Sequence, residues 1–138
     1  MREIKFRAMQ KPSGMVLDMG YKPIMLFGTG IIKDPVNTWL VSSDPTQAIA
    51  FGEKKDIIET ETLGQFTGLR DKNNKEIYEG DIIEYQDVKE FGEERMVEIK
   101  RHTVKDLLAY INAMNWIPYS GEVIGNIHEN PELLKANQ

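Results

Sequence analysis

Short alternating runs of apolar and polar residues dominate the 138-residue chain. In residues 2–9, Ile4, Phe6 and Ala8 fall on one face of an extended strand, and charged residues fall on the other. Similar short runs, most of them bounded by turn-forming residues, occupy 15–17, 24–32, 38–41, 53–62, 64–69, 82–85, 96–99 and 122–127. The pattern predicts a mainly β protein, a β-rich α+β fold of antiparallel strands.

One segment has the period of a helix instead. Thr103 is suited to cap a helix N-terminus, and Asp106 places a carboxylate near the free N–H groups three residues later. Apolar residues follow at helical spacing, at positions 104, 107, 108, 111 and 114. The spacing predicts one main helix near residues 104–115, ended ahead of Pro118 because proline interrupts a helix. The charged stretch before it, residues 86–95, is predicted to be a loop or a hairpin tip.

The length of the chain is typical of one domain, so we predict a single domain over residues 1–138. A shift of composition near residue 62 marks a subdivision into an N-terminal β segment, 1–62, and a second part, 63–138. No apolar run approaches the ~18 residues that span a bilayer. The N-terminus alternates charged and apolar residues, unlike a signal peptide. The chain has no cysteine, which excludes disulfides and thiolate chemistry. We therefore expect a soluble cytoplasmic protein that does not associate with a membrane.

The net charge of −5 is unevenly spread. Residues 1–33 hold six basic and two acidic residues, a net +4, and the remaining residues hold 11 basic and 20 acidic ones, a net −9. An acidic protein is a poor ligand for nucleic acid, because neutralised phosphates supply most of that affinity. Nucleic-acid binding remains an alternative only through a local basic stripe. Two such stripes are Arg2, Lys5, Arg7 and Lys11, and Lys100, Arg101 and Lys105.

Two loops match known ligand-binding motifs only in part. Residues 71–76 begin like a calcium-binding EF-hand loop, but Lys75, Glu76 and Ile82 stand where the loop needs an oxygen ligand, a glycine and a glutamate. A hairpin loop is the better interpretation. The Gly-Thr-Gly at 28–30 lacks the third glycine and the Lys-Ser/Thr of a nucleotide-binding loop. A β-bulge is the better interpretation there, since glycine inside a strand marks bulges.

The residues most often used in catalysis form no recognisable constellation. His102 and His128 show neither HxH nor HExxH spacing, so we interpret them as surface or turn residues. Facing carboxylates would suit acid–base chemistry, but the strand pattern turns most of the acids between 76 and 84 toward water. Those acids are Glu76, Glu79, Asp81 and Glu84. We predict no enzymatic activity, no catalytic residue, no metal site and no cofactor.

A group of aromatic residues near turns is the candidate partner-binding surface. Small barrels bind partners through such side chains, which combine an apolar body with a polar tip. The segment 116–119, directly after the predicted helix, is also suited to the core or to a contact between subunits. The four candidates are Tyr78, Tyr85, Trp116 and Tyr119.

Three longer stretches carry a family resemblance. They are MREIKFRA at 1–8, QFTGLRDKNNKEIYEGDII at 65–83 and EVIGNIHENPELL at 122–134. In that order and spacing they resemble the YopX family of phage and prophage proteins, which has no assigned biochemical function. The resemblance implies a β-rich fold with an SH3-like barrel in residues 63–138. It carries over no catalytic residue.

Pattern and resemblance together indicate an accessory protein of a phage or prophage. We expect a non-enzymatic module that binds a host or phage protein, with nucleic-acid binding as the alternative. Short β edges and the apolar segment 116–119 also favour a homo-oligomer.

Overall fold

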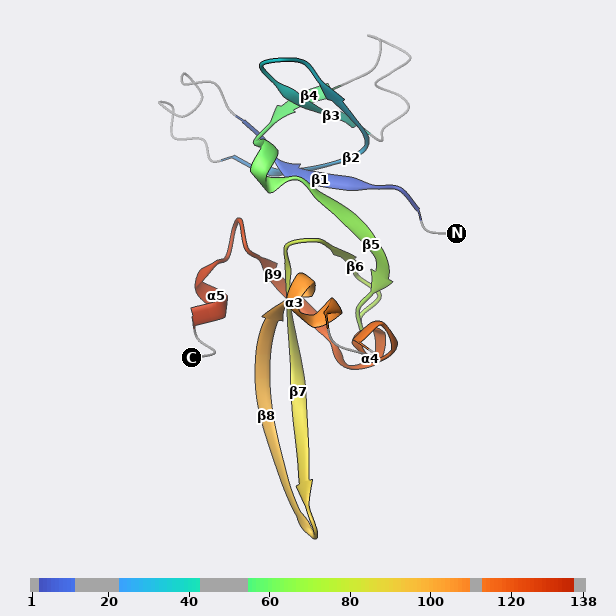
Figure 1. Ribbon diagram of the computed structural model, residues 1–138, viewed down its shortest axis with the longest axis vertical. Helices are drawn as coiled ribbons and strands as arrows, with labels where there is room; N and C mark the ends of the chain where they lie inside the picture. Colours follow the sequence, from blue (N-terminus) through green and yellow to red (C-terminus); the bar gives the residue numbers. More distant parts are fainter. Residues whose placement is uncertain (1–2, 12–22, 43–54, 110–112, 136–138) are drawn as a thin grey trace. The chain divides into compact units, whose positions relative to one another are not determined.

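The computed structural model describes residues 3–11, 23–42, 55–109 and 113–135 (Figure 1). Most of these residues are in antiparallel β-strands, which confirms the predicted β-rich fold. The chain divides into two compact units, residues 1–66 and 67–138. Strand β5 (Gly64–Arg70) contributes residues to both. The short strand predicted at 15–17 lies outside the described residues.

The first unit is an antiparallel sheet. Its strands lie in the order β4-β3-β2-β1-β5, and a single 3₁₀ turn, η1, connects β4 to β5. The core of this unit consists of Ala8, Leu40 and Ile58, against which Phe6 and Leu26 pack. The bounds are β1 Phe6–Met9, β2 Met25–Lys33, β3 Thr38–Ser42, β4 Lys55–Ile58 and η1 Thr60–Thr62.

A bulge in β2 occurs where the sequence predicted one. The pairing of β2 with β3 shifts between Gly28 and Gly30, so Gly28 faces Ser42 and Gly30 faces Val41. A Cβ at Gly28 would clash with the carbonyl oxygen of Val41. Only glycine lets the two backbones approach this closely. The Gly-Thr-Gly sequence therefore has a packing role.

The second unit is built on a three-stranded sheet with the order β8-β7-β9. Helices α3 and α4 pack beside it, and the three elements share one core. Its elements are β6 Glu76–Tyr78, β7 Asp81–Phe91, β8 Glu94–Thr103, α3 Val104–Leu108, α4 Ala113–Ser120, β9 Glu122–Asn126 and α5 Glu132–Lys135. The buried core residues are Ile77, Ile83, Val104, Leu107, Ala113, Ile117 and Val123.

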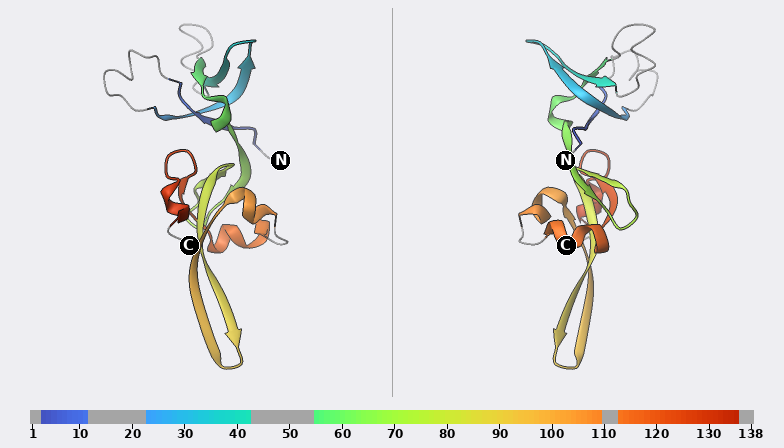
Figure 2. Two further views of the ribbon diagram at one scale, coloured as in Figure 1. Left: turned by 60° about the vertical axis from the view of Figure 1, so that its left-hand side comes forward. Right: turned by 90° about the vertical axis from the view of Figure 1, so that its right-hand side faces the viewer.

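Strands β7 and β8 continue far beyond this core. They pair without a register shift from Ile82 opposite Thr103 to Phe91 opposite Glu94, whereas β9 pairs with β7 no further than Glu84. Residues 85–100 therefore form a two-stranded hairpin, here named the arm, which projects past α3 and α4 in all three ribbon views (Figures 1 and 2). Gly92, with a φ of 64°, makes the turn at its tip.

The structure corrects two predictions in this unit. Of the two alternatives for residues 86–95, the loop is wrong and the hairpin tip is right, because β7 and β8 occupy most of this stretch and only the turn at Gly92 separates them. The single helix predicted near residues 104–115 is replaced by two shorter ones, α3 and α4, and Pro118 lies inside α4. Proline removes one backbone donor, and the burial of Ala113 and Ile117 stabilises the helix despite that loss. The predicted cap is confirmed, because Thr103 Oγ1 accepts a hydrogen bond from the N–H of Asp106 at 3.2 Å.

The SH3-like barrel expected for residues 63–138 is not confirmed. In the part of the chain that the structure describes, the strand order of each sheet has two open ends, and neither sheet closes into a barrel. A barrel needs its first and last strands to pair.

Candidate partner-binding surface

The four aromatic residues predicted as a partner-binding surface have different environments. Tyr78 is only 4% exposed, and its backbone N–H donates to Asp81 Oδ2 at 2.8 Å. The rings of Tyr85 and Trp116 are in contact, with 4.9 Å between their centroids. Tyr119, in contrast, is 82% exposed at the end of α4. The structure thus joins Tyr85 with Trp116, buries Tyr78 and leaves Tyr119 facing solvent.

A pocket of about 350 Å³ lies at the base of the arm. It forms beside the first residue of β9, Glu122, beyond which β7 has no paired strand on that side, and Tyr85 and Tyr119 both line it. We name it the base pocket. Its lining residues are Lys72, Glu84, Tyr85, Gln86, Val88, Ile99, Tyr119, Ser120 and Glu122.

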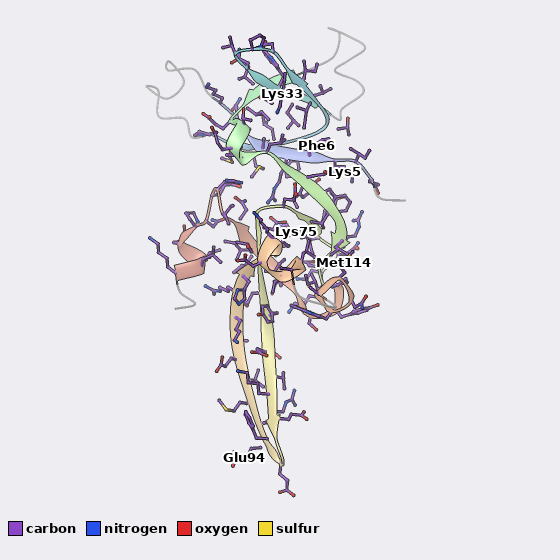
Figure 3. The ribbon with its side chains drawn as sticks, in the orientation of Figure 1. Lys5, Phe6, Lys33, Lys75, Glu94 and Met114 are labelled. Carbon is purple, nitrogen blue, oxygen red and sulfur yellow. The ribbon has the colours of Figure 1, made fainter. Side chains whose placement is uncertain are left out.

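The arm exposes apolar side chains on both of its faces. Residues directly opposite in an antiparallel pair share a face, and the face alternates along each strand. Val88, Val97 and Ile99 therefore lie on one face, and Phe91 and Met96 on the other. Their exposed fractions run from 40% at Val88 to 59% at Phe91. Figure 3 shows side chains standing out from both strands of the hairpin, with Glu94 at its tip.

The sequence analysis missed this apolar surface. Val97 and Ile99 were within a predicted strand, but Val88 and Phe91 are surrounded by charged residues and were placed in a loop. A weak signal was present. The signal is Gly92, the one glycine between positions 85 and 100. A turn there sets residues 85, 87, 89 and 91 opposite 100, 98, 96 and 94.

Two ion pairs cross the hairpin between β7 and β8. Lys100 Nζ lies 2.7 Å from Asp87 Oδ2, and Arg101 Nε lies 3.0 Å from Glu84 Oε2. The hydrogen bond from Lys100 lowers the pKa of Asp87 below its ordinary 3.8, and the same bond raises the pKa of Lys100 above its ordinary 10.5. Both basic side chains are thus engaged with carboxylates of the neighbouring strand.

The Asp87–Lys100 pair predicts a pH dependence of the arm. Since the pKa of Asp87 is lowered on folding, its stabilisation is present above 3.8 and is lost as the pH falls through the lower pKa of the folded protein. We expect Asp87→Asn to reduce the hydrogen-exchange protection of the arm amides at about pH 6, and to have no effect once the pH is well below that pKa. Glu93→Gln, in the turn of the arm and outside the β7–β8 ladder, is the control and should change protection at neither pH. An effect of Asp87→Asn that is equal at both pH values would contradict the assignment.

The acids that resembled catalytic or calcium-binding groups mostly hold the backbone or neighbouring bases. Asp71 is buried and accepts hydrogen bonds from the N–H groups of Asn73, Lys75 and Val123, each at 2.9 Å. Glu76 lies 3.6 Å from Arg70 in an ion pair. Asp81, as described, accepts from Tyr78, and Glu84 pairs with Arg101. Glu79 is exposed.

The two histidines lie at separate structural positions. His102 is in β8, where its ring centroid is 5.8 Å from that of Tyr85. His128 follows β9, and its N–H donates to Asn126 Oδ1 at 3.0 Å. Across the described residues, no group of three or more His, Cys, Asp or Glu is arranged to hold a metal ion.

The basic residues of the predicted stripes are divided among different environments. In the N-terminal stripe, Arg7 is only 6% exposed, and Lys5 lies 3.0 Å from Glu3 and over the Phe66 ring. In the second stripe, Lys100 and Arg101 project from opposite faces of β8 because they are adjacent in a strand. This placement does not favour a continuous basic surface, and nucleic-acid binding stays an untested alternative.

Within the described ranges, no helix is long and apolar enough to cross a membrane.

The fold and the surface define a class of β-rich proteins that carry a long, solvent-exposed hairpin. The family model described as YopX protein matches residues 5–135, and the chain belongs to the YopX family. A crystal structure of protein EF1440 from Enterococcus faecalis is similar to this chain, with a TM-score of 0.50 and 26% sequence identity. That similarity covers 97% of this chain and 99% of EF1440. Among curated proteins, the search found no match.

Proposed function

We propose that this chain is a non-enzymatic, protein-binding accessory module of a phage or prophage, and that it binds a phage or host protein through the apolar faces of the arm. One observation carries the proposal. The arm places five large apolar side chains in solvent on a hairpin that extends beyond the core. Exposed apolar groups gathered on one element mark interaction sites more often than scattered ones do.

The charge of the arm supports a protein partner over a nucleic acid. Residues 85–100 contain five acidic and three basic residues, a net charge of −2. A ribbon that binds DNA needs cations facing the phosphates, whereas Lys100 is already held by Asp87. A gel shift at low salt, the condition that favours binding, tests the nucleic-acid alternative. We expect no shift.

The roles of the buried acids support a binding module over an enzyme. Both carboxylate oxygens of Asp71 are occupied by backbone N–H groups, and Asp81 accepts from Tyr78. Carboxylates fixed in this way stabilise turns and strand ends.

Capture from a bacterial lysate tests the proposal. The full tagged chain is compared with a double variant, Val97→Glu with Ile99→Glu, which places carboxylates on one apolar face of the arm. We expect capture of the partner to fall by at least about tenfold, because an unpaired charge buried in an interface is costly. Val36→Glu is the matched control, because Val36 is 84% exposed in the first unit and is not on the arm.

The expected pattern is specific. The wild type and Val36→Glu should retain the same protein, the arm variant should lose it, and nuclease treatment should change neither result. Equal capture by all three proteins would reject the arm as the binding surface, and loss of capture after nuclease would indicate a nucleic acid instead.

A further inference from the structure

One edge of the arm has no neighbouring strand among the described residues. On β7, pairing with β9 ends at Glu84 and pairing with β8 continues to Phe91. Residues 85–91 therefore have β8 on one side only. In an antiparallel ladder, alternate residues direct their N–H and C=O groups away from the partner strand. The seven-residue edge can accept a further strand.

Two of the usual protections of a free edge, proline and a β-bulge, are absent from this segment. Residues 85–91 contain no proline or glycine, and their pairing with β8 shows no register shift. Natural proteins cover or interrupt such edges to prevent pairing with other chains. One protection is present, because Lys89 puts a charge on the edge, and edge pairing therefore requires a carboxylate opposite it.

We propose that the β7 edge binds the β7 edge of a second copy of this chain, antiparallel, with Val88 opposite Val88 on a twofold axis. Val88 is the midpoint of the free edge, so this register uses the whole of it. It places Asp87 opposite Lys89 of the second copy, twice by symmetry. It also places Tyr85 opposite Phe91 of the second copy, again twice.

The sequence of the edge favours this register over its neighbours. Opposite charges and aromatic pairs directly across a ladder are stabilising, and like charges are destabilising. A shift that moves the axis by one residue sets Asp87 against Asp87 or Lys89 against Lys89. Only the register centred on Val88 sets Asp87 opposite Lys89 and also Tyr85 opposite Phe91.

The outer edge of β8 is a poorer candidate for self-pairing. Centred on Val97, it would set Met96 opposite Glu98 and Arg95 opposite Ile99 of a second copy, so that apolar residues meet charges. The base of β8 is also engaged with α5, where Arg101 Nη1 donates to the carbonyl oxygen of Leu133 at 3.4 Å. The β7 edge is therefore the one whose side chains complement themselves.

This inference goes beyond the proposed function, because the occupant is the chain itself and the contact is a strand edge. Edge pairing over seven residues buries less surface than the roughly 1,600 Å² of a standard stable interface. We therefore expect a reversible dimer that forms as the concentration rises from about 10 μM to about 1 mM.

Charge exchange at positions 87 and 89 tests the register. Lys89→Asp sets carboxylates against Asp87 on both sides of the axis, and we expect it to weaken dimerisation by about tenfold. Asp87→Lys sets ammonium groups against Lys89 and should do the same. An equimolar mixture of the two variants restores opposite charges at every position and should dimerise. Arg95→Asp, on β8, makes the same change of charge and should dimerise like the wild type.

A single introduced cysteine gives a second, independent test. The chain has no cysteine of its own, and directly opposed residues of an antiparallel pair have Cα atoms roughly 4.5–5.5 Å apart, within the range of a disulfide. Val88→Cys should therefore form a disulfide-linked dimer under mild oxidation. Val97→Cys, opposite Val88 within one chain, is the control and should stay monomeric.

Sedimentation equilibrium of the full chain and its variants gives the decision, with circular dichroism to verify folding. A monomer mass for the wild type over the whole concentration range would overturn the proposal. So would a dimer that Lys89→Asp leaves intact, or a mixture of the two charge variants that stays monomeric. None of these results depends on the capture of a foreign partner, so failure here and failure of the proposed function are separable.

Discussion

Asp71→Ala is expected to destabilise the second unit by about 3 kcal/mol or more. The carboxylate is 4% exposed and accepts three backbone hydrogen bonds. Two close the loop at Asn73 and Lys75, and the third reaches Val123, 52 residues away in β9. Without the carboxylate, buried N–H groups lose their acceptor, which costs more than the bonds themselves contribute.

The measurement is denaturant unfolding followed by the fluorescence of Trp116, the tryptophan of the second unit. Asp71→Asn keeps the shape but replaces one acceptor oxygen by a donor, so we expect a loss of stability between those of the wild type and Asp71→Ala. Glu93→Gln, an exposed acid of the same unit, is the control and should change stability by no more than about 0.5 kcal/mol. A cost for Asp71→Ala as small as that of the control would refute this role.

Gly28→Ala is expected to destabilise the first unit by about 2–3 kcal/mol. The added methyl group would clash with the carbonyl oxygen of Val41 and would lie 2.9 Å from Leu40 Cγ. The first of these contacts is with backbone, so relief requires β2 and β3 to move apart at the bulge.

Gly30→Ala is the matched control, because it lies two residues along the same strand. A Cβ there would meet Val41 side-chain atoms at 3.5 and 3.6 Å, which are ordinary van der Waals distances. We expect it to change stability by less than about 1 kcal/mol. Trp39, in β3, reports the first unit when Trp116 is replaced by phenylalanine. Equal effects of the two glycine substitutions would show that the close approach at Gly28 is not limiting.

Period-two alternation predicted the strands that have one buried face. In β1, Ala8 is buried and Phe6 packs against the same core, as the alternation indicated, but Ile4 is 64% exposed and Arg7, assigned to the charged face, is buried. The bulge at Gly28 and the cap at Thr103 were also predictable, because each depends on local chemistry. Local signals of this kind are read directly from residue type and spacing.

The arm could not be recognised in the same way. Both of its faces are in solvent, so no hydrophobic period is required, and Val88 and Phe91 alternate with charges. Its strands are stabilised by contacts with each other, such as the ion pair of Asp87 with Lys100. Which residues meet across the hairpin depends on the position of the turn at Gly92. Because hydrophobic periodicity identifies only strands with a buried face, it assigns charge-rich segments such as this one to loops.

The helical prediction failed for a related reason. Val104 and Leu107 are buried, but Leu108 is 38% and Met114 62% exposed, so the apolar stripe does not continue along one helix. Among the candidate aromatics, residue type alone could not separate Tyr78, which is buried, from Tyr119, which is exposed. That difference depends on tertiary packing, which the sequence pattern does not contain.

Strand β8 ends at Thr103 and α3 begins at the next residue, so the arm and the core helix are joined without a linker. The arm is accordingly continuous with a helix whose Val104 and Leu107 are buried in the core of the second unit. A molecule that binds the folded arm therefore stabilises the second unit as a whole. Binding adds RT ln(1 + [L]/Kd) to the free energy of unfolding of this unit, where [L] is the free concentration of the bound molecule. Candidate partners can therefore be screened by the rise in melting temperature that they cause.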